Sequence, residues 1–475
     1  MAVTPESPDR QYSTRLRTAL VLTGTGTAGA YHAGVLRALH EAGIRIDLVA
    51  ARGIGSVGAA FAAMDGGARL WEPGGLWRGA ASQKYYAWRP ALRAAGWSVV
   101  AAGAIVAVPL VLLVAAVIAA MAGMILTFVG LTGAGTAIAG GYARVIAAAF
   151  APHALPTVIP RLALLAVLVA IAAGFTTLLP SRRGGGRRRA QRGLAGRVLG
   201  GPLAAASLAE RCTSELWNLI RGAAPLGAPP RAELARRFID LLTENLGQPG
   251  FRELLIIVHD LDARRDLVFA LLGGPYRGRF FNRQAPDTAA RAVEAFDLTG
   301  VARDHALDAV IASLALPIGT EPHLVHFAPE GPWRGESHRL CDRPGSLARV
   351  IEEVTAAGAE QIILAAATPA AGRPHELSAG RADLRGYAAE QLASFEAAAL
   401  RDVVEHAAGR YAGLFVIRPL HNPLGPLDFA GIYDERSDRV HTLGEQLDRG
   451  YEDAYRQFIE PIVAGSAERT EAVHR

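Results

Sequence analysis

Ser56 is the residue of this chain with the clearest chemical surroundings. It lies in R-G-I-G-S-V-G (residues 52–58), after the apolar run Asp47 to Ala51 and before a helix-forming segment of small residues. A serine on a sharp strand-to-helix turn, flanked by glycine, is the arrangement of a nucleophile elbow. The pattern therefore predicts that Ser56 is a nucleophile.

A glycine-rich loop precedes this serine. G-T-G-T-A-G (residues 24–29) follows the apolar run Ala19 to Thr23 and opens directly into a segment with helical periodicity. Such a loop directs free backbone N–H groups and the positive end of the helix dipole at one place. We expect that place to hold an anion, either bound or formed during a reaction.

The loop has two other interpretations. Its G-x-G-x-x-G spacing matches a dinucleotide-binding turn, which also needs an acidic residue at the end of the second strand. That strand ends at Ala51 and Arg52, and the nearest acid, Asp47, stands at its start. The other interpretation is a turn that only allows a helix and a strand to pack closely.

Taken together, the two turns resemble the motifs of the patatin-like phospholipases. The first motif of that family, G-G-G-x-R-G followed by G-V-L, is similar to residues 24–29, followed by His32 and by G-V-L at 34–36. The second, G-x-S-x-G, is similar to I-G-S-V-G at 54–58. The resemblance covers roughly residues 18 to 65 and 250 to 460.

The resemblance implies a patatin-like three-layer α/β fold with a mostly parallel central sheet, and a lipid acyl hydrolase. A-S-L-A-L-P (residues 312–317) is similar to the stretch ahead of the family's Asp-Gly motif, which corresponds here to Asp342-Arg343. Asp342 would then be the base that deprotonates Ser56. The oxyanion hole would be formed by the loop residues Gly24, Thr25, Gly26 and Thr27. No cofactor is implied.

Four residues depart from the family pattern and support an alternative. They are Thr25, Ala28, Ile54 and Arg343, which stand where the motifs have glycine, a basic residue, glycine and glycine. The alternative is a catalytically inactive relative that keeps the fold for lipid binding or protein interaction.

Composition predicts a membrane element. The chain has 475 residues, 51% of them hydrophobic, with a formal net charge of +5 and a mean hydropathy of +0.21. No charged residue occurs from Ser98 to Gly130, a run longer than the roughly 20 residues that cross a bilayer. Leu162 to Leu179 is a second uncharged run. We therefore predict a transmembrane hairpin with Trp97–Leu131 and Arg161–Leu179 as its two crossings.

Charge and aromatic residues orient this hairpin. The arginine-rich stretch Arg182 to Arg197 predicts a cytoplasmic flank that binds anionic headgroups rather than nucleic acid. Aromatic residues between Trp71 and Trp97, mixed with arginine and lysine, suit a membrane–water interface, although Trp71 and Trp77 are near enough to the domain to pack in its core. Because the α/β pattern lies on both sides of the hairpin, an even number of crossings is required, and both soluble parts are expected in the cytoplasm.

The predicted organisation has six segments. They are a polar tail (1–17), the first part of the α/β domain (18–96), the transmembrane insert (97–180), a basic linker (181–204), the second part of the α/β domain (205–465) and a polar tail (466–475).

The other polar candidates favour structural roles. His32 is expected to be a hydrogen-bonded core residue, and Asp260 and Asp262 are expected to form a turn or a cap rather than a cation site. His323 and His326 lack a third ligand nearby, so we predict no metal site. The two cysteines, Cys212 and Cys341, are far apart in sequence and fit a reducing compartment.

Overall fold

The computed structural model describes residues 12–149, 151, 155–176, 201–282, 293–331, 333–369, 384–407, 413–434 and 438–464. The predicted arginine-rich stretch and the C-terminal tail lie outside these residues. The described residues form two compact units. Unit 1 holds those up to Ala87 and from Leu203 onward, and unit 2 holds those from Trp88 to Pro202.

Unit 1 is built on a nine-stranded, mostly parallel sheet. Its main order is β11-β10-β1-β2-β5-β6-β7, with β9 beside the end of β5 and β8 beside β9. Strands β11, β10, β1, β2 and β5 are parallel, whereas β6 turns back antiparallel to β5. The strands are β1 (Thr18–Thr23), β2 (Leu48–Arg52), β5 (Glu253–Asp260), β6 (Arg265–Leu271), β7 (Val293–Asp297), β8 (His323–His326), β9 (Ser337–Cys341), β10 (Gln361–Ala366) and β11 (Gly413–Ile417). Short strands are β3 (Ala87–Trp88), β4 (Leu203–Ala204), β12 (Ile432–Asp434) and β13 (Arg439–His441).

The sheet joins the two halves of the sequence, as predicted. β2 from the first half pairs with β5 from the second, with Ala50 opposite Leu255. β1 pairs with β10, with Val21 opposite Leu364. The α/β class and the mostly parallel sheet are therefore confirmed.

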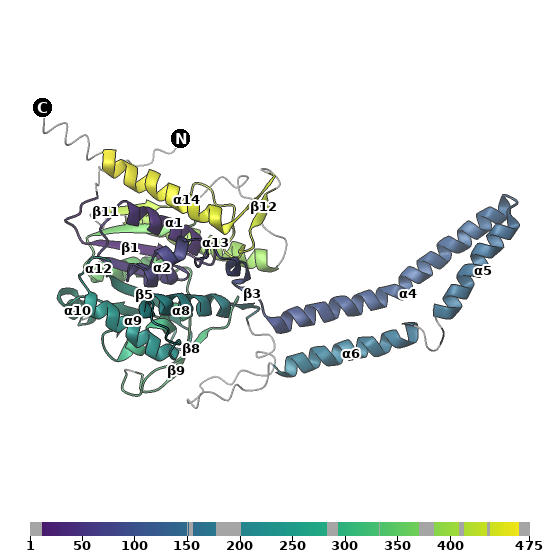
Figure 1. Ribbon diagram of the computed structural model, residues 1–475, viewed down its shortest axis with the longest axis horizontal. Helices are drawn as coiled ribbons and strands as arrows, with labels where there is room; N and C mark the ends of the chain where they lie inside the picture. The colour runs from purple at the N-terminus through teal and green to yellow at the C-terminus, as the bar shows by residue number, and fades with distance from the viewer. Residues whose placement is uncertain are drawn as a thin grey trace. The chain divides into compact units, whose positions relative to one another are not determined.

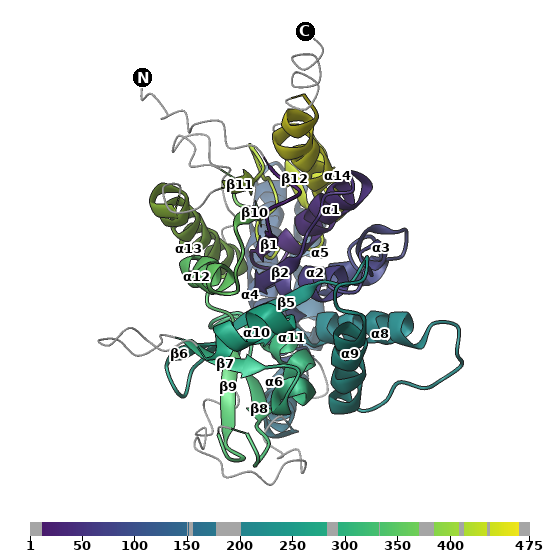
Figure 2. The same ribbon diagram turned by 90° about the vertical axis from the view of Figure 1, so that its left-hand side faces the viewer.

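Helices cover both faces of this sheet (Figures 1 and 2). α12 and α13 lie on one face, and α1 and α14 lie on the other. The helices of unit 1 are α1 (Ala28–Glu41), α2 (Gly55–Ala62), α3 (Ala68–Trp71), α8 (Ala206–Arg221), α9 (Arg231–Asn245), α10 (Gly274–Phe281), α11 (Ala306–Ser313), α12 (Leu347–Ala356), α13 (Leu384–Ala407) and α14 (Leu443–Ala454). Shorter helical turns are Ala80–Lys84, Val301–His305 and Tyr455–Ile459.

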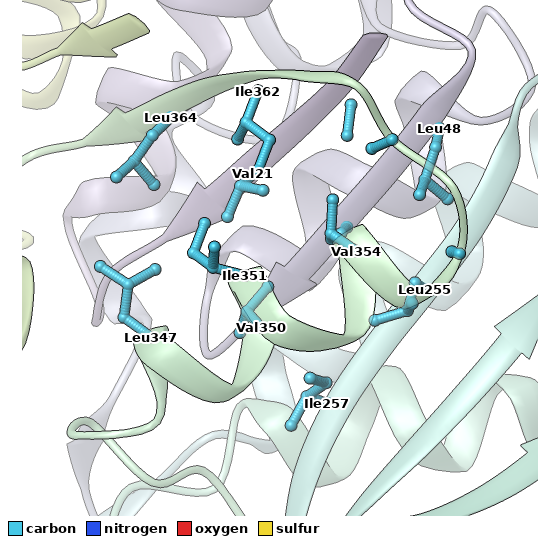
Figure 3. Packing of buried hydrophobic residues seen from close by; sticks show 14 of the residues in the cluster. Val21, Leu48, Leu255, Ile257, Leu347, Val350, Ile351, Val354, Ile362 and Leu364 are labelled. Carbon is cyan, nitrogen blue, oxygen red and sulfur yellow. The ribbon is translucent and has the colours of Figure 1, made fainter. Parts of the chain in front are cut away.

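The core shows why the residues of α12 form a helix. Its apolar residues recur at helical spacing and make one face, which packs on four parallel strands (Figure 3). Full burial of each large aliphatic side chain contributes about 1.5 to 3 kcal/mol. The helix residues are Leu347, Val350, Ile351 and Val354, and their strand partners include Val21, Leu48, Leu255, Ile257, Ile362 and Leu364.

α1 and α14 touch through glycines. A Cβ atom on Gly34 of α1 would lie 1.9 Å from the Leu447 carbonyl oxygen of α14. Reciprocally, a Cβ on Gly450 would lie 2.2 Å from the Tyr31 oxygen. The Tyr31 hydroxyl donates to Asp453 at 3.0 Å, so the two helices are also joined by a buried hydrogen bond. Both glycines are required by this close helix crossing.

Unit 2 consists of α4 (Pro90–Phe128), α5 (Thr132–Ala149) and α6 (Leu155–Thr176). α4 is one uninterrupted helix of 39 residues, and α5 and α6 lie along it (Figure 1). Small residues allow α5 to approach α4, since a Cβ on Gly135 would lie 2.5 Å from the Gly123 oxygen. The Tyr142 hydroxyl of α5 donates to the Leu112 carbonyl oxygen of α4, which also joins these two helices.

One helix among the described residues is long and apolar enough to cross a membrane. It is Leu92–Phe128, with a mean hydropathy of 2.9 and no buried residue in its most apolar window. This segment contains most of the first predicted crossing. The second predicted crossing stays a prediction, and its last residues, 177–179, lie outside the described part of the chain.

The aromatic residues divide between the two units. Trp77, Tyr85 and Tyr86 are buried in unit 1, where Tyr86 stacks on Phe429 at 5.5 Å between ring centroids. The interfacial role predicted for Tyr85 and Tyr86 is therefore wrong, because they complete the α/β core. Trp97, in α4, is 72% exposed.

Candidate active site

The glycine loop and the Ser56 turn meet at the carboxyl ends of β1 and β2. These strands are parallel neighbours, so the segments that follow them leave the sheet at the same edge. The Ile54 N–H donates to the Gly24 oxygen at 3.0 Å and joins the two turns. The structure therefore brings together the two predicted motifs.

The sharp turn lies before the serine rather than at it. Gly53 has φ of +56°, whereas Ile54 has φ of −63° and is unstrained. Ser56 is the second residue of α2, and its side chain is fully buried. The departure at Ile54 therefore places no strain on the turn, since the conformation that needs glycine falls on Gly53. A nucleophile elbow exposes its serine hydroxyl, and here that hydroxyl is covered.

The Ser56 hydroxyl is held by its own turn. Oγ donates to the Gly53 oxygen at 2.8 Å and contacts the hydroxyl of Ser313, at the end of α11. The Ser313 hydroxyl also donates to the Val310 oxygen at 2.6 Å. A serine in the first turn of a helix commonly bonds to a nearby carbonyl in this way.

Asp342 is placed at the same edge of the sheet, directly after β9. Its N–H donates to the Ala315 oxygen at 2.9 Å. A Cβ on Gly53 would lie 3.0 Å from Asp342 Oδ2, so the carboxylate lies beside the turn that carries Ser56. Among the described residues, however, no hydrogen bond joins Asp342 to the Ser56 hydroxyl.

Arg52 holds the Asp342 carboxylate instead. Its Nε donates to Oδ1 at 3.2 Å and its Nη2 to Oδ2 at 2.8 Å, so both oxygens face one guanidinium. The two side chains are each only 1% exposed. A two-point contact of this kind is the strongest pairing of arginine with a carboxylate.

Glu396, on α13, completes a buried charge network around Arg52. Arg52 Nη2 donates to Glu396 Oε1 at 3.0 Å, and the Thr25 hydroxyl donates to the same oxygen. The Thr23 hydroxyl accepts from Arg52 Nη1 at 2.9 Å. One guanidinium thus serves two carboxyl groups, and the network is neutral when one of them retains a proton.

Burial governs ionisation in this network. It raises the pKa of Asp342 and of Glu396, and the attraction to Arg52 only partly opposes the effect. Burial would by itself lower the pKa of Arg52, but the two carboxylates outweigh it and raise that pKa above its ordinary value. Arg52 therefore stays charged.

The backbone N–H groups of the glycine loop, where an oxyanion hole is predicted, differ in their hydrogen bonding. The Thr27 N–H is used, since it donates to the Pro426 oxygen at 2.9 Å. The N–H groups of Thr25 and Gly26 donate to no described residue. Gly26 has φ of +59°, and a Cβ there would lie 1.7 Å from the Pro426 oxygen, so only glycine fits.

His32 has the structural role that the sequence predicts. It is fully buried, with Nε2 3.0 Å from the Thr23 oxygen. Burial lowers the pKa of His32 to about 4, so the ring is neutral at physiological pH.

Two acids at the end of β5, Asp260 and Asp262, form a turn and ion pairs. Asp260 accepts from the Asp262 N–H at 2.8 Å and also contacts His338 Nδ1 at 2.7 Å. Asp262 pairs with Arg339 at 2.7 Å. The turn predicted at these two acids is confirmed.

The two histidines of β8 have separate partners. His323 Nε2 lies 2.8 Å from Asp308, and His326 Nδ1 lies 2.6 Å from the Ser337 hydroxyl.

Three residues of this site were not predicted from the sequence: Arg52, Glu396 and Ser313. For two of them the surrounding sequence indicates a buried charged residue. Arg52 is a lone cation at the end of an apolar strand that is buried on both faces, and such a charge needs a partner. Glu396 falls on the buried side of α13, four residues after Leu392 and four before Leu400. Ser313 has no comparable signal.

Comparison with known proteins assigns this chain to no family. A scan of the chain against protein-family models gives no match, and a search of curated proteins gives no significant match.

Proposed function

We propose that this chain is a membrane-anchored, patatin-like α/β protein that associates with membrane lipids without hydrolysing them. The observation that carries this proposal is the two-point ion pair between Arg52 and Asp342. A serine nucleophile needs a base that accepts its proton. Asp342 uses both oxygens on Arg52, and the Ser56 proton is donated within its own turn.

Burial gives the second support for an inactive centre. Ser56 is fully buried and Asp342 is 1% exposed. An acyl ester must approach the nucleophile to about 3 to 3.5 Å before reaction. In this arrangement Ser313 contacts the Ser56 hydroxyl, where a base would have to lie, and Arg52 holds both Asp342 oxygens.

For membrane anchoring, we infer that Trp97–Leu131 and Arg161–Leu179 cross the bilayer and that both soluble parts lie in the cytoplasm. The exposed apolar surface of α4 supports this, since its most apolar window has no buried residue. Arg182 to Arg197 would then bind anionic headgroups beside the second crossing.

The second candidate function is the lipid acyl hydrolase, with Ser56 and Asp342 as a dyad. One observation favours it: the N–H groups of Thr25 and Gly26 have no partner among the described residues and lie in the loop that touches the Ser56 turn. Such donors are what an oxyanion requires. This function would need Arg52 to release Asp342.

Fluorophosphonate labelling distinguishes the two candidates. We expect the purified full-length protein to label no more than Ser56→Ala, and to release no more fatty acid from phosphatidylcholine vesicles, because its serine is covered and unactivated. A purified serine esterase added to the same detergent solution serves as the positive control. Labelling that is lost in Ser56→Ala and in Asp342→Asn would establish the hydrolase instead.

Alkaline extraction tests the anchoring. We expect the full chain to stay with the membrane pellet in sodium carbonate at high pH, because the apolar surface of α4 cannot be transferred to water without a large cost. Immunoblotting of pellet and supernatant measures this. Quantitative release of the protein, while an integral membrane marker stays in the pellet, would contradict it.

A further inference from the structure

Ile318 has an unfavourable backbone conformation and an unfavourably exposed apolar side chain. It has φ of +64°, a left-handed conformation that sterically disfavours β-branched side chains. Its side chain is also 94% exposed. Exposed turns of this shape normally use glycine, asparagine or aspartate, which are compatible with both features. An isoleucine in this position therefore indicates an apolar surface that covers it.

The loop that carries Ile318 is fixed by its neighbours. The Thr320 N–H donates to the Leu316 oxygen at 3.1 Å, which closes the loop Leu316–Thr320. The Leu203 N–H donates to the Gly319 oxygen at 2.9 Å. The isoleucine is thus held outward by backbone hydrogen bonds on both sides.

These contacts also locate the loop at the junctions with the apolar insert. Leu203 is the first described residue of unit 1 that follows unit 2 in the sequence. Tyr86 comes just before Ala87, the last residue of unit 1 that precedes unit 2, and its hydroxyl donates to the Leu314 oxygen at 2.8 Å. The residues of unit 1 on both sides of the insert are therefore hydrogen-bonded to the segment Leu314–Thr320.

Only a short stretch of chain connects this junction to α4. Two residues separate Ala87 from Pro90, where α4 begins. From Pro90 to Trp97 the helix rises only about 10 Å. Trp97 and the nearby Arg93 are residue types that gather at the membrane–water interface. These helix and chain lengths hold Ala87, at the junction, within about 20 Å of that interface.

We propose that Leu316–Thr320 is a membrane-contact loop that inserts Ile318 into the headgroup layer of the bilayer holding α4. The proposal rests on the proposed anchoring. The same segment contacts the candidate site, since Ala315 accepts from the Asp342 N–H and Ser313 contacts Ser56. The loop would therefore dock the carboxyl edge of the sheet, and the candidate site, on the lipid surface.

Depth-dependent fluorescence quenching tests the proposal. Ile318→Cys, labelled with a nitrobenzoxadiazole maleimide, is reconstituted as the full chain in phosphatidylcholine–phosphatidylglycerol nanodiscs. Both native cysteines, Cys212 and Cys341, are buried, and unmodified protein measures their background labelling. The matched control, Gln248→Cys, is an exposed position before β5, at the opposite edge of the sheet. Leu113→Cys in α4 reports the anchoring itself.

We expect shallow doxyl-labelled lipid to quench the probe at 318 at least twofold more than at 248, and aqueous iodide to quench 248 more than 318. If 113 is quenched by lipid while 318 behaves like 248, the loop does not touch the membrane and the anchoring stands. Protection of 318 from both quenchers would mean that protein covers Ile318, which also overturns the proposal. Failure of lipid to quench 113 would overturn the anchoring and the loop together.

Discussion

Replacement of Arg52 by methionine should lower the free energy of unfolding by about 3 to 5 kcal/mol, because it leaves two buried carboxyl groups without their cation. Asp342 would lose both of its side-chain hydrogen bonds, and Glu396 would keep only the Thr25 hydroxyl among the partners described here. Thermal unfolding of the detergent-solubilised protein, followed by circular dichroism, measures the change. A fall of about 3 to 6 °C in Tm is expected for a chain of this size.

The matched control removes the whole charge network. In the triple variant Arg52→Met, Asp342→Asn, Glu396→Gln, no charge stays buried, so most of the stability should return. If the triple variant is as unstable as Arg52→Met alone, the loss comes from packing of the long arginine side chain and not from unpaired charge.

The effect of Arg52→Met should also depend on pH. In the native protein burial raises the pKa of Asp342 and Glu396, so their favourable contribution is present at low pH and is lost as pH rises through the folded-state pKa values. Without Arg52 those pKa values rise further. The stability deficit relative to wild type should therefore be larger at pH 8 than at pH 5, and equal deficits would contradict this ionisation scheme.

Gly34→Ala should destabilise the α1–α14 contact by about 1 to 3 kcal/mol, the usual cost of overpacking. The added methyl would lie 1.9 Å from a backbone oxygen of α14 and 2.7 Å from the Tyr451 nitrogen, so the helices must separate. Alanine favours the helix itself by roughly 1 kcal/mol, which only partly offsets this. Thermal unfolding measures the result.

Gly278→Ala is the control for this substitution. Gly278 is inside helix α10, and a Cβ there would meet nothing within 4 Å. The same exchange should therefore raise stability slightly. Equal shifts in Gly34→Ala and Gly278→Ala would mean that the helix crossing tolerates a methyl group.

Most of the elements and their order follow from the pattern of residues. β5 (Glu253–Asp260) and β10 (Gln361–Ala366) could be predicted because uninterrupted apolar runs bounded by turn residues form buried parallel strands. α12 could be predicted because its apolar residues repeat at helical spacing. α4 could be predicted because its charge-free run is far longer than any strand.

The sequence also determined that the two motifs meet. Parallel strands that are followed by tight turns present those turns at one edge of a sheet, so the glycine loop and Ser56 had to be neighbours once β1 and β2 paired. A resemblance in motif spacing was sufficient to place Asp342 near this edge, because β9 ends beside β5.

The partners of these residues could not be predicted without the tertiary structure. Arg52 and Ser56 are close in sequence, at the end of β2 and the start of α2, but Asp342 follows β9 and Glu396 lies in α13. Motif spacing says nothing about which of these side chains fills a shared buried space. A guanidinium reaches both carboxyl groups and is always charged, whereas a serine hydroxyl donates one neutral hydrogen bond. Once Arg52 is buried among them, electrostatics favours Arg52 over Ser56 as the partner of Asp342.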